Sequence, residues 1–416
     1  MKKCFIFIFI IVVFIVTIIL GVYSSKKYIL SETPVVLSEN SRMVTGIENV
    51  ETNDEYEEFI NEEPESIVVE LERKEDVAFS MSVIGDIMCH NSQYKDAYKN
   101  GKYDFSYVFD DIKPYIENAD IAIGNLETTF AGNEKGYSSY PNFNTPEALA
   151  EDLRELGIDV LSTANNHSLD TGYKGIESTI DYLDAAGVSH TGTYKSIEKQ
   201  NEILYKDVNG LKIAFLAYTY GTNGIDLPNG KEYCINLIDK DLIKRQLDLA
   251  KQEKPDIICV NMHWGEEYQV RPNDEQLDLE RFLFENGVDI ILGSHPHVLQ
   301  PMEVKEFTMP DGTKKNVFTI YSLGNFVSGQ DKKNTKNSII LNMNIIKEGE
   351  SGKLRFENIN YVPIYTYTSP KYKNYKVLDL PKAIADYENG NFNHYTKSQY
   401  DLFRSELESV NSNITF

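Results

Sequence analysis

Between Val77 and about Tyr365 the chain alternates short apolar runs with stretches patterned like helices. The apolar runs are brief, and several end close to a Gly, Asn or His, which is typical of strands buried within a sheet. Strands that alternate with helices predict an α/β sandwich, and the length of this region leaves room for a second sheet packed on the first. The expected strands cover residues 79–84, 121–123, 160–162, 213–217, 257–260, 290–292, 317–321 and 339–346.

Helix signals fall between these runs. Thr145 can cap a helix whose first turn holds Pro146 and which Gly157 can end. Two further helices are expected from Gly175 to Ala186 and from Asp274 to Asn286, and each is followed directly by a glycine.

Polar side chains stand where the expected strands end. A carboxylate follows each of the first two strands, an asparagine follows the third, and three histidines follow later strands. Ligands of open α/β sheets bind outside the carboxyl ends of the strands, so these side chains are expected to converge. The six positions are Asp86, Glu127, Asn166, His263, His295 and His297.

The six side chains offer two carboxylates, one amide oxygen and three imidazoles. This mixture suits Zn, Mn, Fe or Co better than Ca or Mg. It also exceeds the needs of one four-coordinate ion. Two divalent ions roughly 3.5 to 4 Å apart, bridged by a carboxylate, would use the whole set and would activate water for attack at phosphorus.

Each motif taken alone has a structural alternative. Gly85-Asp86 could be a turn with local hydrogen bonds. Asn165-Asn166-His167 could be a helix cap followed by a surface histidine. His295-Pro296-His297 indicates a metal site more strongly, because the proline stiffens the backbone between the two imidazoles.

An apolar run from Cys4 to Val22 carries no charge and is long enough to span the hydrocarbon core of a bilayer. We predict an uncleaved single-pass helix that anchors the chain in the cell membrane. A cleaved signal peptide is the alternative, but Tyr23–Lys27 follows the run in place of a small-residue cleavage site. The catalytic domain is predicted to be extracellular because the start resembles a signal sequence; lysines flank the run on both sides and do not set its orientation.

Residues from about Glu32 to Asp76 are rich in Glu and poor in core-forming side chains, which predicts a solvated tether, with an interaction tail as the alternative. A short strand at 66–69 is expected within it. The chain end is polar and helical in pattern, for example at 399–410, and indicates no particular role. The predicted organisation is therefore an anchor at 1–27, a tether at 28–76, a catalytic domain at 77–370 and a C-terminal helical tail at 371–416.

Composition excludes some partners. The 64 Asp and Glu against 41 Lys and Arg give a formal net charge of -23, which repels polyanions, so nucleic acid is not an expected partner. Bound cations could still reverse the sign of the charge at a local site. The four cysteines lack any CxxC spacing, which predicts buried thiols and neither a disulfide framework nor a zinc finger.

Six ordered motifs between about residues 79 and 365 resemble the CapA/PgsA family. They are VIGDIMCH (83–90), GNLET (124–128), TANNHSLDTG (163–172), MHWGEEY (262–268), GSHPHVLQP (293–301) and SLGNFV (322–327). That family belongs to poly-γ-glutamate capsule biosynthesis. The resemblance implies a calcineurin-like metallophosphatase fold, with two packed β-sheets flanked by helices.

The resemblance to metallophosphoesterases also implies roles for individual residues. Asp86 and His297 would bind a first metal, Glu127 would bridge, and Asn166, His263 and His295 would bind a second. His167 would act as a general acid oriented by Asp170, and Asn325 would line the pocket. The chain departs from the usual phosphoesterase pattern in two places. Those enzymes usually carry Asp-x-His after the first strand, but here Met88 occupies the histidine position, and Glu127 stands where an aspartate is usual. His90, four residues after Asp86, could reach the same cleft.

Three functional hypotheses follow from these features. The chain could be a membrane-anchored component that helps to make, export or attach poly-γ-glutamate together with other capsule synthase subunits. It could instead be a surface metallophosphoesterase for a small phosphate ester. It could also be a non-catalytic assembly subunit whose metal site is structural.

Overall fold

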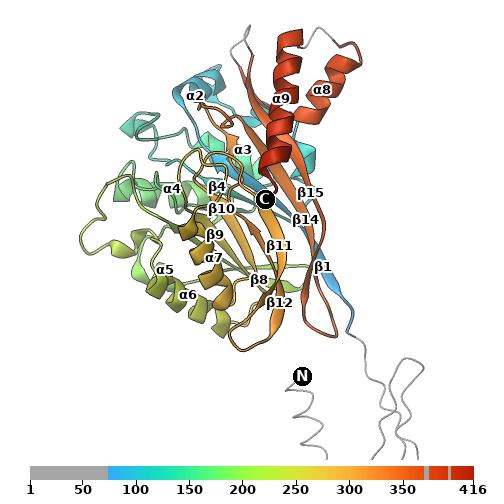
Figure 1. Ribbon diagram of the computed structural model, residues 1–416. Helices are drawn as coiled ribbons and strands as arrows, with labels where there is room; N and C mark the ends of the chain where they lie inside the picture. The colour runs from blue at the N-terminus through green and yellow to red at the C-terminus, as the bar shows by residue number, and fades with distance from the viewer. Residues whose placement is uncertain (1–73, 370–373, 392–394) are drawn as a thin grey trace, which may run out of the picture. The chain divides into compact units, whose positions relative to one another are not determined.

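The computed structural model describes residues 74–369, 374–391 and 395–416 (Figure 1). The predicted membrane anchor, the tether up to residue 73 and the strand expected at 66–69 lie outside the described residues. Within the described ranges, no helix combines the length and the apolar character needed to cross a bilayer.

The first of two large sheets holds most of the N-terminal strands and the last three strands of the chain. Its order is β16-β15-β14-β1-β4-β5-β6, with β13 pairing beside the end of β1. The strands β4, β5 and β6 run parallel to β1, whereas β14, β15 and β16 are antiparallel to their neighbours. Their bounds are β1 (Val77–Ile87), β4 (Ile121–Leu126), β5 (Val160–Ser162), β6 (Ser189–Thr191), β13 (Asn325–Val327), β14 (Asn337–Lys347), β15 (Leu354–Thr368) and β16 (Tyr375–Asp379).

The second sheet has the order β11-β12-β10-β9-β8-β7. Its four inner strands are parallel, and an antiparallel strand closes each edge. The bounds are β7 (Leu204–Val208), β8 (Leu211–Thr219), β9 (Ile257–His263), β10 (Ile290–Ser294), β11 (Met302–Thr308) and β12 (Lys314–Ile320); a separate hairpin pairs β2 (Tyr98–Lys99) with β3 (Lys102–Tyr103).

The two sheets pack face to face through one apolar core. Met81 and Val83 of β1 and Ile123 of β4 share this core with Phe215 of β8 and Cys259 of β9. Every second residue of these strands points into it, as the period of a strand requires. The interior between the sheets therefore forms one continuous apolar core of the sandwich.

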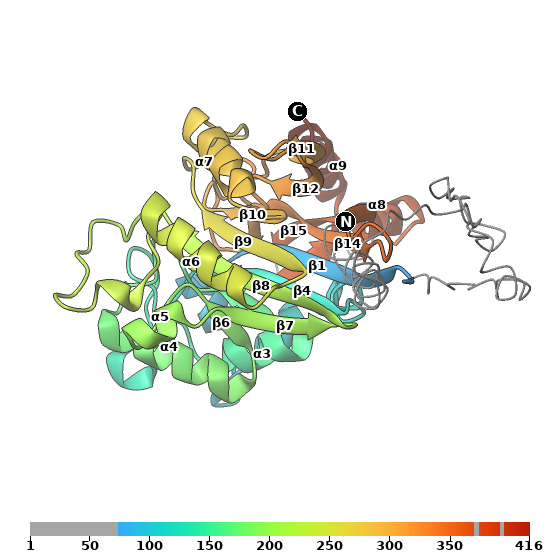
Figure 2. The ribbon, with the colours of Figure 1, turned by 90° about the horizontal axis from the view of Figure 1, so that it is seen from below.

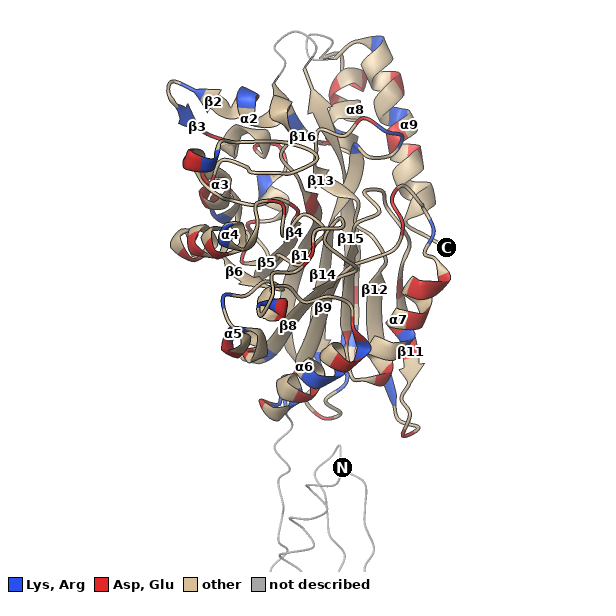
Figure 3. Cartoon of the chain, turned by 90° about the vertical axis from the view of Figure 1, so that its left-hand side faces the viewer, with Lys and Arg blue, Asp and Glu red and all other residues tan. Residues whose placement is uncertain are grey.

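Helices cover the two outer faces. Figure 2 shows α3 (Ala148–Leu156) and α4 (Tyr173–Ala186) on one side and α6 (Lys240–Gln252) and α7 (Asp274–Glu285) on the other. Leucines of α3 and α4 pack on the first sheet, and leucines of α6 and α7 pack on the second. Figure 3 shows Lys, Arg, Asp and Glu mainly on the helices and loops, while the strands are largely uncharged. The remaining short helices are α2 (Asn91–Ala97), α5 (Ile197–Asn201) and the 3-10 helices Ser106–Val108, Lys113–Tyr115, Asn133–Lys135 and Glu232–Cys234.

The structure thus confirms the predicted α/β sandwich of two packed sheets flanked by helices, and each of the eight expected strands is present. One detail was wrong. Helix α3 begins at Ala148, and Thr145 does not cap it, because its Oγ1 bonds Thr128 Oγ1 at 2.6 Å and its N–H donates to Thr129 O. Gly157 ends α3 in the left-handed conformation, as expected.

The end of the chain packs onto the sandwich. Helices α8 (Leu380–Glu388) and α9 (Lys397–Asn413) lie beside β14 and β15 (Figure 1), with Phe403 buried against Tyr365. The guanidinium of Arg271 donates to the carbonyl oxygens of Asn413, the last residue of α9, and of Thr415 beyond the helix. The residues Lys74–Phe416 form one compact unit.

Candidate metal centre

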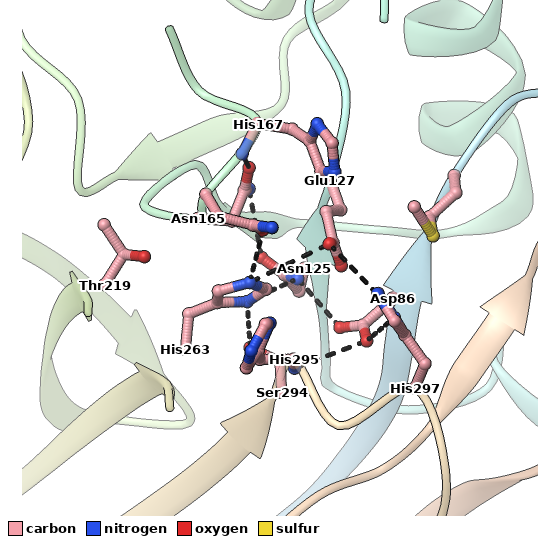
Figure 4. A network of polar contacts seen from close by, with 12 residues as sticks. Asp86, Asn125, Glu127, Asn165, His167, Thr219, His263, Ser294, His295 and His297 are labelled. Carbon is pink, nitrogen blue, oxygen red and sulfur yellow. Dashed lines mark hydrogen bonds and ion pairs between the residues drawn. The ribbon is translucent and has the colours of Figure 1, made fainter. Parts of the chain in front are cut away.

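Five of the predicted ligands lie close together at the strand ends in Figure 4, namely Asp86, Glu127, His263, His295 and His297. Asp86 lies near the end of β1, Glu127 directly follows β4, and His263 is the last residue of β9. Because parallel strands carry their carboxyl ends to the same edge, residues far apart in sequence meet there. Ligand atoms of these three buried residues all lie within 4.8 Å of one another.

Asn125, in β4, connects two of these side chains. Its Nδ2 donates to Asp86 Oδ1 at 2.8 Å and lies 3.4 Å from His263 Nδ1. The register of β1 on β4 places Asn125 opposite Asp86, so the contact follows from the parallel pairing. Asp86 is held in place by a neighbour that the strand order supplies.

Glu127 lies at the centre of the group and has no hydrogen-bond partner for either carboxylate oxygen among the described residues, although both oxygens are buried. Its Oε1 is 3.8 Å from His263 Nε2 and 3.7 Å from His297 Nε2. These distances exceed those of a hydrogen bond. They match ligand atoms that share one ion, since metal–ligand bonds of about 2.0–2.2 Å place neighbouring ligand atoms about 3–4 Å apart.

Asn166 faces the group through its amide oxygen. Its Oδ1 lies 2.8 Å from His263 Nε2, and its Nδ2 donates to Asn223 Oδ1 at 3.1 Å. The bond to Asn223 turns the amide so that the oxygen points to the metal-ligand side chains. His263 is fixed from its other nitrogen by Ser294 Oγ at 2.9 Å.

Burial and neighbouring charges set the protonation of the group. Burial, and then the charge of Asp86, raise the pKa of Glu127 well above its ordinary value. Burial, and then the neighbouring histidines, lower the pKa of His263 well below its ordinary value and that of His295 to about 3. The imidazoles of His263 and His295 are therefore neutral, which is the form that binds a metal.

The loop that carries His295 and His297 has an unusual backbone. Both residues have positive φ, at 97° and 58°, a region that non-glycine residues seldom adopt. The loop is held by Tyr268, whose N–H donates to Pro296 O at 2.8 Å. The His295 ring stacks at an angle on His263, with centroids 4.8 Å apart, and its buried Nδ1 has no partner among the described residues.

These observations fit a divalent metal. The two oxygens of Glu127 and Nδ1 of His295 are buried polar atoms without hydrogen-bond partners among the described residues, which is costly unless something binds them. The mixed oxygen and nitrogen donor set suits a transition metal. Asp86, Glu127 and His263 form the group itself, and Asn166, His295 and His297 contact its members.

His167 and Asp170 form a pair beside the ligands. His167 Nδ1 lies 2.8 Å from Asp170 Oδ2, which also accepts the N–H of Phe143 at 2.7 Å. The Phe143 ring meets His167 edge-on, with centroids 4.7 Å apart. His167 is 3% exposed, so the alternative of a surface histidine after a cap was wrong.

His90 lies beside the group, but its hydrogen bond and ring contact are with residues other than the predicted ligands. Its Nδ1 accepts the N–H of Gly329 at 3.0 Å, and its ring meets the edge of Phe143. Burial lowers the pKa of His90 to about 4. Met88 is buried, and its sulfur contacts Ser328 Oγ at 3.7 Å.

Several residues of the site were not predicted as such. Asn125 and Asn165 stand within the quoted motifs, next to predicted ligands, and Asn165 Nδ2 donates to Leu126 O at 2.6 Å. Asn223 and Tyr220 come from the loop after β8, where the sequence carries no signal. The Tyr220 ring lies 4.4 Å from that of His295 and remains 46% exposed, which makes it a wall of the site that faces solvent. Burial and the charge of Glu127 raise the pKa of its hydroxyl to about 12.

Comparison with known proteins agrees with the six motifs. Residues 80–330 match the family model of the bacterial capsule synthesis protein PGA_cap. The chain is 30% identical to capsule biosynthesis protein CapA of Bacillus anthracis, over 68% of this chain and 67% of that protein. It is 32% identical to PGA biosynthesis protein CapA of Bacillus subtilis, over 68% of this chain and 71% of that protein.

Among solved structures, the chain is similar to the calcineurin-like phosphoesterase YfkN from Bacillus subtilis. The two are 16% identical, with a TM-score of 0.40, over 69% of this chain and 90% of that one. On the family match and the two relatives, the chain belongs to the bacterial capsule synthesis protein PGA_cap family, which confirms the resemblance predicted from the motifs.

Proposed function

We propose that this chain is a membrane-anchored, extracellular protein of poly-γ-glutamate capsule biosynthesis that acts through a metal-dependent, phosphoesterase-like hydrolytic site. The observation that carries the catalytic part is the buried carboxylate of Glu127, which lacks hydrogen-bond partners and is surrounded by metal-binding atoms. The capsule role is supported by family membership and by the names of the two Bacillus relatives.

Two divalent ions, Mn, Zn or Fe, would be held by the six ligands. Asp86 and His297 would hold the first, Asn166, His263 and His295 the second, and Glu127 would bridge them. When bound, such ions supply an activated water and positive charge opposite the reacting phosphoryl oxygens.

The chain's own residues supply the remaining chemistry. To act as a general acid, His167 must carry a hydrogen on both ring nitrogens: Asp170 accepts the Nδ1 hydrogen and orients the ring, and His167 donates the Nε2 hydrogen to the leaving oxygen. Tyr220 keeps its hydroxyl hydrogen, since its pKa is raised, and forms the solvent-facing wall against which a substrate packs.

The apolar run at 4–22 would hold the domain at the outer face of the membrane, where other capsule synthase subunits would be its partners. The alternatives are a surface phosphoesterase for a small ester and an assembly subunit with a structural metal. Activity and polymer yield, measured together, separate these alternatives from the proposal.

The test uses the full chain in a polymer-producing host whose own CapA gene is deleted. We expect the wild-type chain to restore surface poly-γ-glutamate and the variants Asp86→Asn and Glu127→Gln to fail, while all three accumulate in the membrane. The purified wild-type chain loaded with Mn²⁺ should hydrolyse bis-p-nitrophenyl phosphate, and both variants should not. Glu280→Gln is the control, because Glu280 is a buried carboxylate outside the site that pairs with Lys305.

Restored polymer with both variants would show that the metal ligands are dispensable and would refute the catalytic proposal. Hydrolysis by the wild-type chain without restored polymer would instead favour the surface phosphoesterase.

A further inference from the structure

The SLGNFV motif places Asn325 at the metal site. Asn325 begins β13, a short strand that pairs in parallel with β1, and its Cα partner in this pairing is that of Asp86. The Asp86 N–H donates to Gly324 O at 2.9 Å. Asn325 is fully buried, so it lies beside the ligands on a rigid element.

The orientation of the Asn325 amide is fixed by its surroundings. Nδ2 donates to the backbone oxygen of Thr335 and to Gln330 Oε1, both at 2.9 Å. A backbone carbonyl can only accept, so a flipped amide would set two oxygens against each other at Thr335. Oδ1 must therefore face His297, whose Nδ1 lies 3.0 Å away.

This orientation decides which nitrogen of His297 carries the hydrogen. Nδ1 faces two acceptors, Asn325 Oδ1 at 3.0 Å and Asp86 Oδ2 at 3.2 Å. A neutral imidazole has one donor and one acceptor nitrogen, so the hydrogen belongs on Nδ1. Nε2 then presents its lone pair on the side of Glu127 Oε1, 3.7 Å away.

We propose that Asn325 is a positioning residue of the metal centre, which locks His297 in the tautomer that leaves Nε2 free to bind a metal. The proposal rests on the metal site of the proposed function and is independent of its substrate. Partners of this kind around a ligating histidine typically contribute 10- to 100-fold to metal affinity.

The segment that holds Asn325 also braces the other side of His297. Thr335 N–H donates to the carbonyl oxygen of Lys332. The Lys332 ammonium lies 3.7 Å from the centre of the Tyr268 ring, and the centroids of the Tyr268 and His297 rings are 6.2 Å apart. The residues after β13 thus act on His297 from two sides. Of these two contacts only the one through Asn325 acts on the tautomer, and it does so together with Asp86 Oδ2, the other acceptor at Nδ1.

Two substitutions separate positioning from simple support of this segment. Asn325→Leu and Asn325→Asp both lose the hydrogen bond to the Thr335 carbonyl, but only Asn325→Leu loses the acceptor that faces His297 Nδ1. The first measurement is the ¹⁵N spectrum of the metal-free full chain in detergent, labelled at its seven histidines, with His297 assigned from His297→Gln. The second is the affinity for Mn²⁺ or Zn²⁺ by chelator competition.

We expect His297 to carry its hydrogen on Nδ1 in the wild-type chain and in Asn325→Asp. In Asn325→Leu this preference should weaken, since Asp86 Oδ2 remains as an acceptor at Nδ1. Metal binding should weaken 10- to 100-fold in Asn325→Leu. Asn236→Leu is the matched control, because Asn236 is a buried asparagine bonded to Ala217 O and Gln246, away from the metal ligands. It should change the unfolding temperature but not the His297 spectrum.

Four results would overturn the proposal. A hydrogen on Nε2 of His297 in the wild-type chain would do so even if Asn325→Leu failed to fold. Equal loss of the tautomer in Asn325→Asp and Asn325→Leu would make the role one of loop support. Unchanged metal affinity in Asn325→Leu would contradict the positioning role alone. A wild-type chain that binds no metal would contradict both the positioning role and the proposed function.

Discussion

At the scale of single residues, the buried carboxylate of Glu127 is the strongest indication of a metal site. A buried carboxylate without hydrogen bonds is unstable as an anion, so in the metal-free protein it holds a proton at a pH where an ordinary glutamate has lost it. A bound cation offers the same oxygens a partner and displaces that proton. The state of Glu127 is thus coupled to metal binding.

This coupling predicts a pH dependence. Since the pKa of Glu127 is raised, metal binding below that pKa must release its proton, and metal affinity should increase as the pH rises toward it. Calorimetry of Mn²⁺ binding in buffers of different ionisation enthalpy measures the release. Glu127→Gln should remove the released proton, and the same release from that variant would contradict the assignment.

His167 should be separable from metal binding. Because its Nδ1 bonds Asp170, His167→Asn is expected to keep the metal content and to lower hydrolysis about 10²- to 10⁴-fold. Elemental analysis and initial rates on bis-p-nitrophenyl phosphate check the two parts. His190→Asn is the control, since His190 also pairs with an aspartate, Asp184, on the outer helix α4. Full activity of His167→Asn would exclude the general-acid role.

At the scale of elements, the site depends on how closely β13 approaches β1. A Cβ at Gly85 would lie 1.9 Å from Gly324 O, a distance that only glycine permits. Gly85 therefore allows Asp86 and Asn325 to stand opposite each other. A comparable approach occurs on the other sheet, where a Cβ at Gly293 would lie 1.9 Å from Tyr321 O.

Gly85→Ala should push β13 away from β1. The expected cost is about 1–3 kcal/mol of unfolding free energy, together with weaker metal binding, measured by urea unfolding and chelator competition. Gly221→Ala is the matched control, because a Cβ there meets nothing within 4 Å, and its effect should stay within about 0.5 kcal/mol. Similar unfolding curves for both variants would show that the β1–β13 contact is not tight in solution.

At the scale of the whole molecule, the described residues from Lys74 onward contain both sheets, the metal-ligand group and α9 in one unit. The proposed function assigns residues 1–27 to the membrane anchor, and the candidate metal site is built from described residues alone.

Removal of residues 1–27 should therefore move the protein from the membrane fraction to the soluble fraction and leave its unfolding temperature and Mn²⁺ affinity unchanged. Fractionation followed by immunoblotting, with a carbonate wash of the full chain as the control, measures this. Release of the full chain by the wash would contradict a membrane-spanning anchor.

A strand that is buried on both faces appears in the sequence as a short apolar run, which can be recognised from a few residues. The alternation of such runs with helix-patterned stretches was therefore enough to predict the two-sheet sandwich. The same pattern located Asp86, Glu127 and His263, since parallel strands present their carboxyl ends at one edge. It did not predict the position of β14–β16 beside β1 or the packing of α8 and α9. Those contacts join distant segments and leave no local signal.

The sequence by itself determined the kind of fold, the family and the set of side chains that could bind a metal. Only the tertiary structure decided which atoms of these side chains face each other. His297 lies 211 positions from Asp86 in the sequence. The amide of Asn325 is oriented by its hydrogen bonds to Gln330 and Thr335, which lie in the segment after β13. Residue type limits what a side chain can bind, but hydrogen bonds between distant segments select its tautomer, its orientation and its partners.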